Sequence, residues 1–254
     1  SMITKCIACV YRPWILDARV KPVESALGLA TGYSFPSGHT VIATTVLGSF
    51  AYTLRKNHRA IAVLFVVVVL LIGFFRNFLG VHTLADVVVA LLIGLISVLV
   101  CARFCDWLQN HRQHDAKVLA GVLLIAVVAL VFVILKPYPM DYVDGVLLVD
   151  PAEMQKDCFE GIGLFVGLFL GWYCERRWVN FSTDNLTWKT RIIRIVIGLV
   201  LVALVMLGID PLLKMALDLR WAKLVSRIIV AFCALFVAPA IFAKLQHDTR
   251  EQHA

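Results

Sequence analysis

The stretch GYSFPSGHTVIATTVLGSFAY, residues 32–52, places a Pro-Ser-Gly-His run directly before an apolar segment suited to lipid. The free backbone N–H groups and the positive end of the dipole at a helix N-terminus form a site for anions. Gly38 lets a ligand come close to the backbone, and Ser37 adds a hydroxyl donor. The pattern therefore predicts a helix that begins near residue 38 and binds an anion at the membrane surface.

The composition around this stretch indicates a membrane protein. The chain has 254 residues, of which 61% are hydrophobic, and a mean hydropathy of +0.86. Soluble domains are only about half apolar. We expect an all-α, polytopic membrane helix bundle with about seven spans, near residues 39–54, 60–75, 83–102, 118–136, 159–174, 191–209 and 226–243.

The first thirteen residues, SMITKCIACVYRP, carry no signal-peptide pattern and are too short to span a bilayer. We expect the chain to begin inside a helix and to be a fragment that lacks upstream spans. The alternative is that Ser1 is an added residue ahead of a native Met2.

Charge predicts the orientation in the membrane. If side A is the side where residue 39 enters, side A carries the acidic segment 139–157, whereas most cations fall in loops on side B: Arg55, Lys56, Arg59, Arg103, Arg112, Lys117, Arg176, Arg177, Lys189, Arg191, Arg194, Lys244 and Arg250. The positive-inside rule then places side B in the cytoplasm of a multi-pass protein of the cell membrane, and side A outside or in the periplasm. The net charge of +7 is mostly this topology signal, so nucleic acid is not an expected partner.

Three polar clusters fall on side A by the same alternation. They are Lys5-x6-Arg12-Pro13, the Pro36-Ser37-Gly38-His39 run, and Arg76-x5-His82-x3-Asp86. Taken singly, each cation has a plain reading as a side chain that snorkels to the interface, His39 as a helix cap, and Asp86 as a partner for a nearby cation. Taken together, they gather three fixed cations, two histidines and a carboxylate at one depth.

The third cluster has the pattern of an activated nucleophile. A charge inside a span costs roughly 2.5–3.5 kcal/mol on insertion scales, so Asp86 needs a reason for its position. The i, i+4 spacing predicts that His82 and Asp86 share one helical face, where a carboxylate fixes the imidazole tautomer and raises its basicity. Arg12 and Arg76 offer planar forks for phosphate oxygens, and Lys5 a point charge. The expected ligand is a phosphate group at the depth of lipid head groups.

These three motifs, in this order and spacing, resemble the signature of the type 2 phosphatidic acid phosphatase superfamily, which includes lipid phosphate phosphatases and undecaprenyl pyrophosphate phosphatases. The resemblance covers roughly residues 1–136, the predicted phosphatase core, which is N-terminally incomplete because two of the family's six helices would precede Lys5. Residues 137–254 form additional membrane helices of unknown role. One difference is Phe75, which stands where the family usually has Ser, so one hydroxyl contact to phosphate would be lost.

The resemblance implies a role for each motif residue. His82 would attack phosphorus and form a phosphohistidine, Asp86 would orient His82, and His39 would protonate the leaving alkoxide and then activate water. Five residues would bind the phosphate oxygens: Lys5, Arg12, Ser37, Gly38 and Arg76. No carboxylate cluster suited to Mg²⁺ accompanies these motifs, so we expect metal-independent action without a cofactor.

The leading hypothesis is an integral membrane phosphatase that hydrolyses a lipid phosphate or pyrophosphate monoester within the bilayer, with its active site on the outer face. One alternative is a lipid phosphoryl transferase that uses the same histidine. Another is a non-enzymatic anion channel or transporter. Phosphatidic acid, phosphatidylglycerol phosphate, isoprenoid pyrophosphate and sphingoid phosphate present a similar head group to such a site, so the sequence leaves the lipid open, as it does the oligomeric state.

Overall fold

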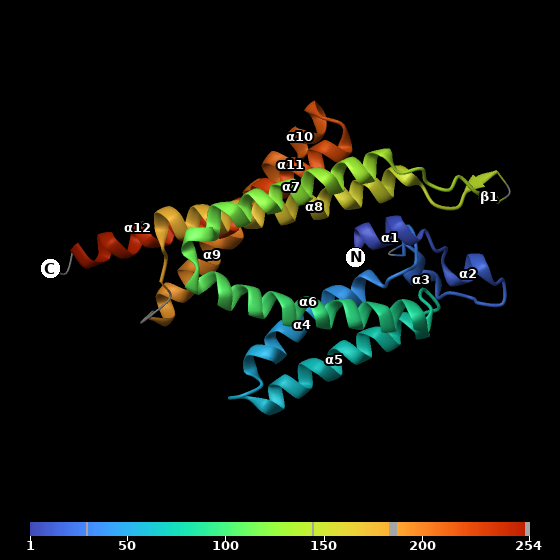
Figure 1. Cartoon of the computed structure of the whole chain (residues 1–254), viewed down its shortest axis with the longest axis horizontal. Helices are drawn as coiled ribbons and strands as arrows, with labels where there is room; N and C mark the ends of the chain where they lie inside the picture. The colour runs from blue at the N-terminus through green and yellow to red at the C-terminus, as the bar shows by residue number, and fades with distance from the viewer. Residues whose placement is uncertain (29, 144, 183–186, 252–254) are drawn as a thin grey trace. The chain divides into compact units, whose positions relative to one another are not determined.

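The computed structural model describes residues 1–28, 30–143, 145–182 and 187–251, with side chains described up to residue 245. The described part of the protein is mostly helical (Figure 1). Its longer helices are α4 (Gly38–Leu54), α5 (Arg59–Phe78), α6 (Leu84–Asn110), α7 (Asp115–Leu135), α8 (Pro151–Cys174), α9 (Trp188–Leu204), α11 (Leu219–Phe232) and α12 (Ala238–Glu251). The all-α prediction is confirmed.

Short elements complete the chain. Four short helices are α1 (Met2–Ala8), α2 (Pro13–Leu16), α3 (Glu24–Leu27) and α10 (Asp210–Ala216). A 3₁₀ turn, η1 (Arg112–His114), precedes α7, and three π-helical turns extend longer helices: η2 (Glu175–Val179), η3 (Val205–Ile209) and η4 (Cys233–Val237). The strands β1 (Tyr142–Val143) and β2 (Val146–Leu147) pair antiparallel, with Tyr142 opposite Leu147.

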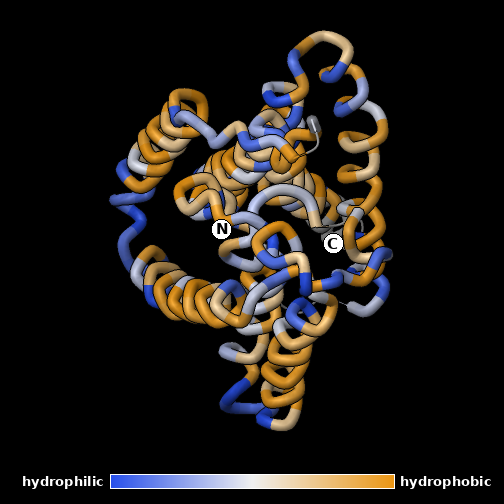
Figure 2. Tube along the Cα trace, turned by 90° about the vertical axis from the view of Figure 1, so that its right-hand side faces the viewer, coloured by the Kyte–Doolittle hydropathy of each residue, from blue (hydrophilic) through white to orange (hydrophobic). Residues whose placement is uncertain are grey.

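Six helical segments of the described chain are long and apolar enough to cross a membrane: Arg59–Phe78, Leu84–Asn110, Arg112–Leu135, Pro151–Val179, Trp188–Ala216 and Leu219–Leu245. Their hydrophobic residues appear as long orange stretches of the Cα tube, and blue, hydrophilic residues gather in the connections between helices (Figure 2). The remaining predicted span, the first in the chain at residues 39–54, corresponds to α4, whose 17 residues lie at the short end of the range for a bilayer. The chain is a multi-pass membrane protein.

The chain divides into two compact units. Unit 1 comprises Ser1–Arg112 with Lys136–Met154, and unit 2 comprises Gln113–Leu135 with Gln155–Ala254. This division differs from the predicted one at residue 136, since α7 belongs to unit 2 and the segment after it to unit 1. The assignment of a phosphatase core to residues 1–136 concerns function and stays a prediction.

The membrane helices of unit 1 are α4, α5 and α6, which pack on one another (Figure 1). Glycines allow the close approach of their backbones. A Cβ at Gly94 of α6 would lie 2.4 Å from Cβ of Thr44 on α4, and one at Gly73 of α5 would lie 2.8 Å from Val87 Cγ1 on α6. This tight packing holds the first turns of α4 and α6 and the last turn of α5 near one another.

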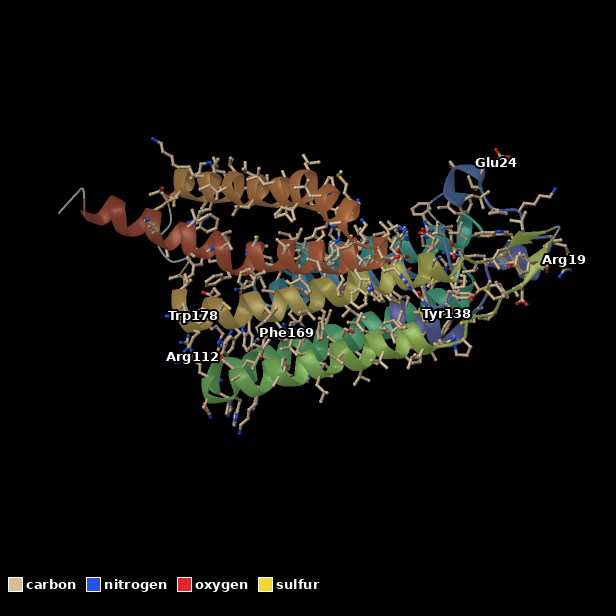
Figure 3. The ribbon with its side chains drawn as sticks, turned by 90° about the horizontal axis from the view of Figure 1, so that it is seen from above. Arg19, Glu24, Arg112, Tyr138, Phe169 and Trp178 are labelled. Carbon is tan, nitrogen blue, oxygen red and sulfur yellow. The ribbon has the colours of Figure 1, made fainter. Side chains whose placement is uncertain are left out.

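The segment Lys136–Met154 is attached to the N-terminal part of unit 1. Tyr11 Oη donates to Asp141 Oδ2 at 2.5 Å, and Lys136 Nζ donates to Cys9 Sγ at 3.1 Å. The buried side chain of Met154 fills the space beside Gly32, where a Cβ would lie 2.2 Å from its sulfur. The β1–β2 hairpin in this segment therefore lies at the same end of unit 1 as α2 (Figures 1 and 3).

Unit 2 is held by close packing of α8 against α11. A Cβ at Gly163 would lie 2.4 Å from the carbonyl oxygen of Leu224, and a Cβ at Gly167 would lie 2.4 Å from that of Ile228. Small residues four apart are a common device for bringing membrane helices together. Beside them, Arg227 Nε donates to Glu160 Oε1 at 2.5 Å, which pairs two charges across the helices. Within α8, the ring of Phe169 contacts the rings of Phe165 and Trp172 (Figure 3).

The contact between Gly94 and Thr44 yields a prediction about stability. Gly94→Ala adds a methyl group where no space exists, and overpacking of this kind costs about 1–3 kcal/mol, more than the ~0.5–1 kcal/mol that Ala gains over Gly in a helix. We expect a fall of several degrees in the midpoint of thermal unfolding in detergent. The control is Gly121→Ala on α7, where no atom lies within 4 Å of the added Cβ and the change should be neutral or stabilising. Equal midpoints for both variants would contradict the packing described here.

Candidate active site

Three segments of unit 1 bring the sequence-predicted residues together. The first is α1 with the turn that follows it, the second is the start of α4, and the third runs from the last turn of α5 to the first turn of α6. Five of the polar side chains that they supply are at most 9% exposed: Lys5, Arg12, Arg76, His82 and Asp86. Buried ionisable groups at the end of membrane helices are costly, so this concentration indicates a functional site.

Lys5 and Arg12 are fixed by backbone carbonyl groups. Lys5 Nζ donates to the carbonyl oxygen of Tyr33, and its Cε would lie 3.9 Å from a Cβ on Gly38. Arg12 donates through Nε to Gly32 O at 3.0 Å and through Nη2 to Thr31 O at 2.8 Å. Both cations are thus held beside the segment that leads into α4.

The guanidinium of Arg76 differs from that of Arg12 in its hydrogen bonding. Arg76, in the last turn of α5, is 9% exposed, yet its Nε and Nη2 have no hydrogen-bond partner among the described residues. Burial lowers the pKa of Arg12 to about 10, and the nearby positive charge of Arg76 acts in the same direction. Buried donors without partners cost free energy, and so do crowded like charges. An anion bound between them relieves both costs.

The start of α4 faces the same cations. Ser37 is the N-cap of α4 and is fully buried, but its side chain makes no capping hydrogen bond and instead contacts Thr40 Oγ1 at 2.9 Å. His39 is exposed, and it interacts electrostatically with Arg76, Arg12 and Lys5. The helix therefore begins at Gly38 as predicted, with its first turn directed toward the cationic cluster.

His82 and Asp86 contact each other, but the predicted reason is wrong. α6 begins at Leu84, so His82 lies before the helix and the pair does not share a helical face. Thr83 is the N-cap, and a capping box joins it to Asp86: Thr83 Oγ1 accepts from Asp86 N at 3.2 Å, while Asp86 Oδ2 accepts from Thr83 N at 2.7 Å. Folding back of the chain at this cap places His82 Nδ1 3.4 Å from Asp86 Oδ2.

Sequence reasoning missed Ser34, which bridges this pair. Its Oγ donates to Asp86 Oδ2 at 2.5 Å and lies 3.2 Å from His82 Nδ1. Ser34 is fully buried and stands two residues before the Pro-Ser-Gly-His run. The only signal was its position, because a serine in a loop of this composition is not distinctive.

The hydrogen bonds of His82 fix its tautomer. Arg12 Nη1 lies 3.0 Å from His82 Nε2, and since a guanidinium only donates, Nε2 accepts and the ring proton is on Nδ1. Nδ1–H then points toward Ser34 Oγ and Asp86 Oδ2. Burial lowers the pKa of His82 to about 4. Asp86 raises this pKa, whereas the positive charges of nearby Arg12 and Lys5 lower it further. The ring is therefore neutral, with its Nε2 lone pair directed at the cationic cluster.

The loop that carries His82 is rigidly shaped. Gly80 has φ +69°, and a Cβ there would lie 3.2 Å from Cα of Pro22, so only glycine suits this position. Asn77, also missed by sequence reasoning, donates through Nδ2 to the carbonyl oxygen of His82 at 2.9 Å. These contacts set the direction of the imidazole.

Phe75, which occupies the place of the family's usual serine, is half exposed and contacts Phe74 edge to face at 5.8 Å between ring centroids. Among the described residues, no group of three or more His, Cys, Asp or Glu side chains is arranged to hold a metal ion.

The pKa of His82 yields a prediction. A depressed pKa keeps the imidazole neutral as the pH falls through 6.5, its ordinary value, and the ring gains its proton only near pH 4. In NMR spectra of protein labelled in its histidine rings, the resonance that disappears in His82→Asn should keep its neutral shifts and Nδ1–H tautomer at pH 5.5. A midpoint near 6.5 would contradict the burial and the contact with Arg12.

Comparison with known families agrees with this geometry. Residues 1–110 match the model described as PAP2 superfamily, and residues 159–250 match the model described as PAP2 superfamily phosphatase, transmembrane extension. The second match covers the helices to which the sequence alone assigned no role. No solved structure matches the chain.

A curated relative is phosphatidylglycerophosphatase B of Bacillus subtilis (strain 168), which is 31% identical over 111 residues. The match covers 41% of this chain and 54% of the relative, so the chain spans about half the length of that protein. The two family models and this relative agree with the resemblance carried by the three motifs, and the chain belongs to the PAP2 superfamily, the type 2 phosphatidic acid phosphatases.

Proposed function

We propose that the protein is an integral membrane phosphatase that hydrolyses a lipid phosphate or pyrophosphate monoester through a phosphohistidine intermediate. The observation that carries this proposal is the buried guanidinium of Arg76, whose Nε and Nη2 lack partners among the described residues beside Arg12 and His39. A phosphate group provides the oxygen acceptors that these donors need, with the planar geometry that suits a guanidinium.

In the bound state, the phosphate oxygens accept hydrogen bonds from Arg76 and from the first backbone N–H groups of α4 at Gly38. Ser37 contributes its hydroxyl, and Lys5 adds charge beside Gly38. Arg12 Nη1 moves its hydrogen bond from His82 Nε2 to a phosphate oxygen, which exposes the Nε2 lone pair. Positioning and charge stabilisation of this kind account for most of phosphoryl-transfer catalysis.

In the first chemical step, His82 Nε2 attacks phosphorus and the bond to the leaving alkoxide oxygen breaks. The imidazole becomes positively charged as the N–P bond forms, and Asp86 stabilises this charge through Nδ1–H, with Ser34 holding the carboxylate. His39, at the start of α4, donates a proton to the alkoxide. The lipid alcohol leaves.

In the second step, His39 accepts a proton from water as the water oxygen attacks phosphorus. The N–P bond breaks, the electron pair returns to His82 Nε2, and inorganic phosphate is released. His39 thus ends the cycle protonated, ready for the next leaving group.

The first test is phosphate release from purified lipid phosphates by wild type and His82→Asn. We expect a loss of about 10⁴-fold or more in kcat, since the nucleophile is removed. His58→Asn, at an exposed position before α5, is the matched control and should retain wild-type rates. Near-normal turnover by His82→Asn would remove His82 from the mechanism.

Metal independence is part of the proposal, because the cations that neutralise phosphate are side chains of the protein. Activity should persist in excess EDTA, and vanadate should inhibit by occupying the phosphate position in five-coordinate form. Loss of activity on chelation that Mg²⁺ restores would contradict the assigned roles of Lys5, Arg12 and Arg76.

The active site is proposed to face outward, in the periplasm or outside the cell, because the positive-inside rule places the opposite loops in the cytoplasm. Reporter fusions at Asn57 and Asn110 should read as cytoplasmic, and one at Asp150 as external. The reverse pattern would place phosphate hydrolysis at the inner leaflet.

A transferase that passes the phosphoryl group from His82 to a lipid acceptor would use the same site, and product analysis with added acceptor lipids separates the two reactions. The name of the Bacillus relative makes phosphatidylglycerophosphate a substrate to include in every panel.

A further inference from the structure

A cavity of about 550 Å³ lies among α4, α5 and α6 of unit 1, and none of the residues assigned to the candidate active site lines it. Among the described residues that do line it, Arg55 carries the only charge, and the others are apolar apart from Thr44 and Tyr52. α5 and α6 both pack on α4, but they separate from each other toward the start of α5 and the end of α6 (Figure 1). The volume is in the range of sites for small molecules.

The lining of this cavity favours an acyl chain as its occupant. Protein interiors are closely packed and contain few voids larger than a water molecule, so a space of this size needs an occupant. Water is a poor one, because it finds few polar partners on apolar walls. Four lining side chains of α5 are 44–61% exposed, so the cavity is open to its surroundings: Val63, Val66, Val67 and Leu70. Around a membrane-spanning helix such as α5, those surroundings are acyl chains.

The cavity has the length of one bilayer leaflet. Along α4 it extends from Thr44 to Arg55, the C-cap residue, which is about 17 Å at ~1.5 Å per residue. Half of the hydrocarbon core of a bilayer is about 15 Å thick. A chain that fills the cavity therefore has its end near Thr44, in the middle of the bilayer, and its head group beside Arg55.

The end of the cavity at which this head group lies is cationic. Arg55, Lys56 and Arg59 follow one another closely in the connection from α4 to α5, and the sequence contains no acidic residue between Glu24 and Asp86. Within the described chain, none of the ion pairs involves any of these three cations. Their charge therefore favours an anionic head group.

Arg55 has donors available for such a head group. Its guanidinium lies over the ring of Tyr52, with 3.5 Å between Cζ and the ring centroid, and its Nη1 donates to the carbonyl oxygen of Tyr52. A guanidinium has five N–H donors, so this hydrogen bond leaves others for phosphate oxygens. Tyr52 is itself typical of the head-group region, where tyrosine rings gather in membrane proteins.

A lipid in this position is not in reach of the proposed nucleophile. α4 begins at Gly38, beside the candidate active site, and ends at Arg55, so about 25 Å of helix separates the two head-group positions. A phosphate held at Arg55 therefore cannot meet His82. The lipid in the cavity is a bound ligand of unit 1 rather than a substrate.

We propose that the cavity binds an acyl chain of an anionic phospholipid, whose phosphate lies among Arg55, Lys56 and Arg59. The chain fills the space among the three helices, and the phosphate neutralises the cations at its end. A zwitterionic phospholipid offers the same chain, but these cations repel its ammonium group. The bound lipid stabilises the packing of α4, whose first turn belongs to the candidate active site.

The test is the Kd of the full chain, in neutral detergent, for dioleoylphosphatidylglycerol and dioleoylphosphatidylcholine, measured by native mass spectrometry. We expect wild type to bind the anionic lipid about tenfold more tightly than the zwitterionic one, since each cation near the head group adds to the affinity. Arg55→Gln, at an exposed position, should weaken binding of the anionic lipid by about tenfold.

A second variant tests the position of the chain. A Cβ at Gly48 would make an ordinary contact, 3.5 Å from Val98 Cγ2, so Gly48→Leu is tolerated and its side chain takes space in the cavity. We expect this variant to fold and to bind both lipids more weakly than wild type does.

The matched control is Lys117→Gln, which removes an exposed cation of α7 that does not line the cavity and should bind both lipids as wild type does. The anionic lipid should also raise the midpoint of thermal unfolding of wild type and of Lys117→Gln more than that of Arg55→Gln. Equal affinity of wild type for the two lipids, or unchanged affinity for the anionic lipid in either Arg55→Gln or Gly48→Leu, would overturn the inference. So would a dimer of wild type that Gly48→Leu dissociates, because a second copy would then occupy the cavity.

Discussion

The arrangement of the site depends on one electrostatic constraint, the burial of two guanidinium groups beside each other at the end of membrane helices. Arg12 satisfies most of its donors with the carbonyl groups of Gly32, Thr31 and Val81. Arg76 does not, and it is buried nonetheless. Buried donors of this kind need acceptors, and the oxygens of an anion can replace the water that they have lost. The positive end of the α4 dipole lies at the same place and also favours a bound anion.

The proposed nucleophile, His82, is positioned by ordinary helix capping. Asp86 Oδ2 accepts from Thr83 N, as in any capping box, and from Ser34 Oγ, and it lies within ion-pair distance of His82 Nδ1. The same oxygen therefore stabilises the start of α6 and holds the imidazole. Since Arg12 binds the other ring nitrogen, His82 is fixed from both sides before substrate arrives. Organisation of this kind in the resting state reduces what substrate binding must supply.

The long helices and most residues of the candidate site were predictable from sequence. The physical rules that gave these predictions also explain which of them were wrong. Apolar runs identified the long helices, because a span must bury its backbone within a continuous helix. The start of α4 followed from Ser37 and Gly38, whose chemistry suits an N-terminus. The i, i+4 spacing predicted correctly that His82 and Asp86 are in contact. It predicted wrongly that they share a helical face, since Thr83 is the N-cap and the helix starts after His82.

The remaining features depend on tertiary structure. Ser34 and Asn77 act through hydrogen bonds to residues distant along the chain or in a loop, which composition does not reveal. The acidic segment 139–157 was predicted to lie on the same side as the site, yet its attachment through Asp141 to Tyr11 required the fold. Phe75, identified as a difference from the family, is half exposed, and its aromatic contact with Phe74 shows what that side chain does here.

The central claim is that His82 carries the phosphoryl group covalently, and trapping of that intermediate tests it most directly. His39→Ala lacks both the general acid of the first step and the general base of the second, so the substrate must have a leaving group that needs no proton. Brief incubation with ³²P-labelled p-nitrophenyl phosphate should therefore leave label on the protein. The account predicts an acid-labile, alkali-stable adduct on the peptide that contains His82, and none in the double variant His39→Ala, His82→Asn. Label on another residue, or label that remains in the double variant, would contradict the account.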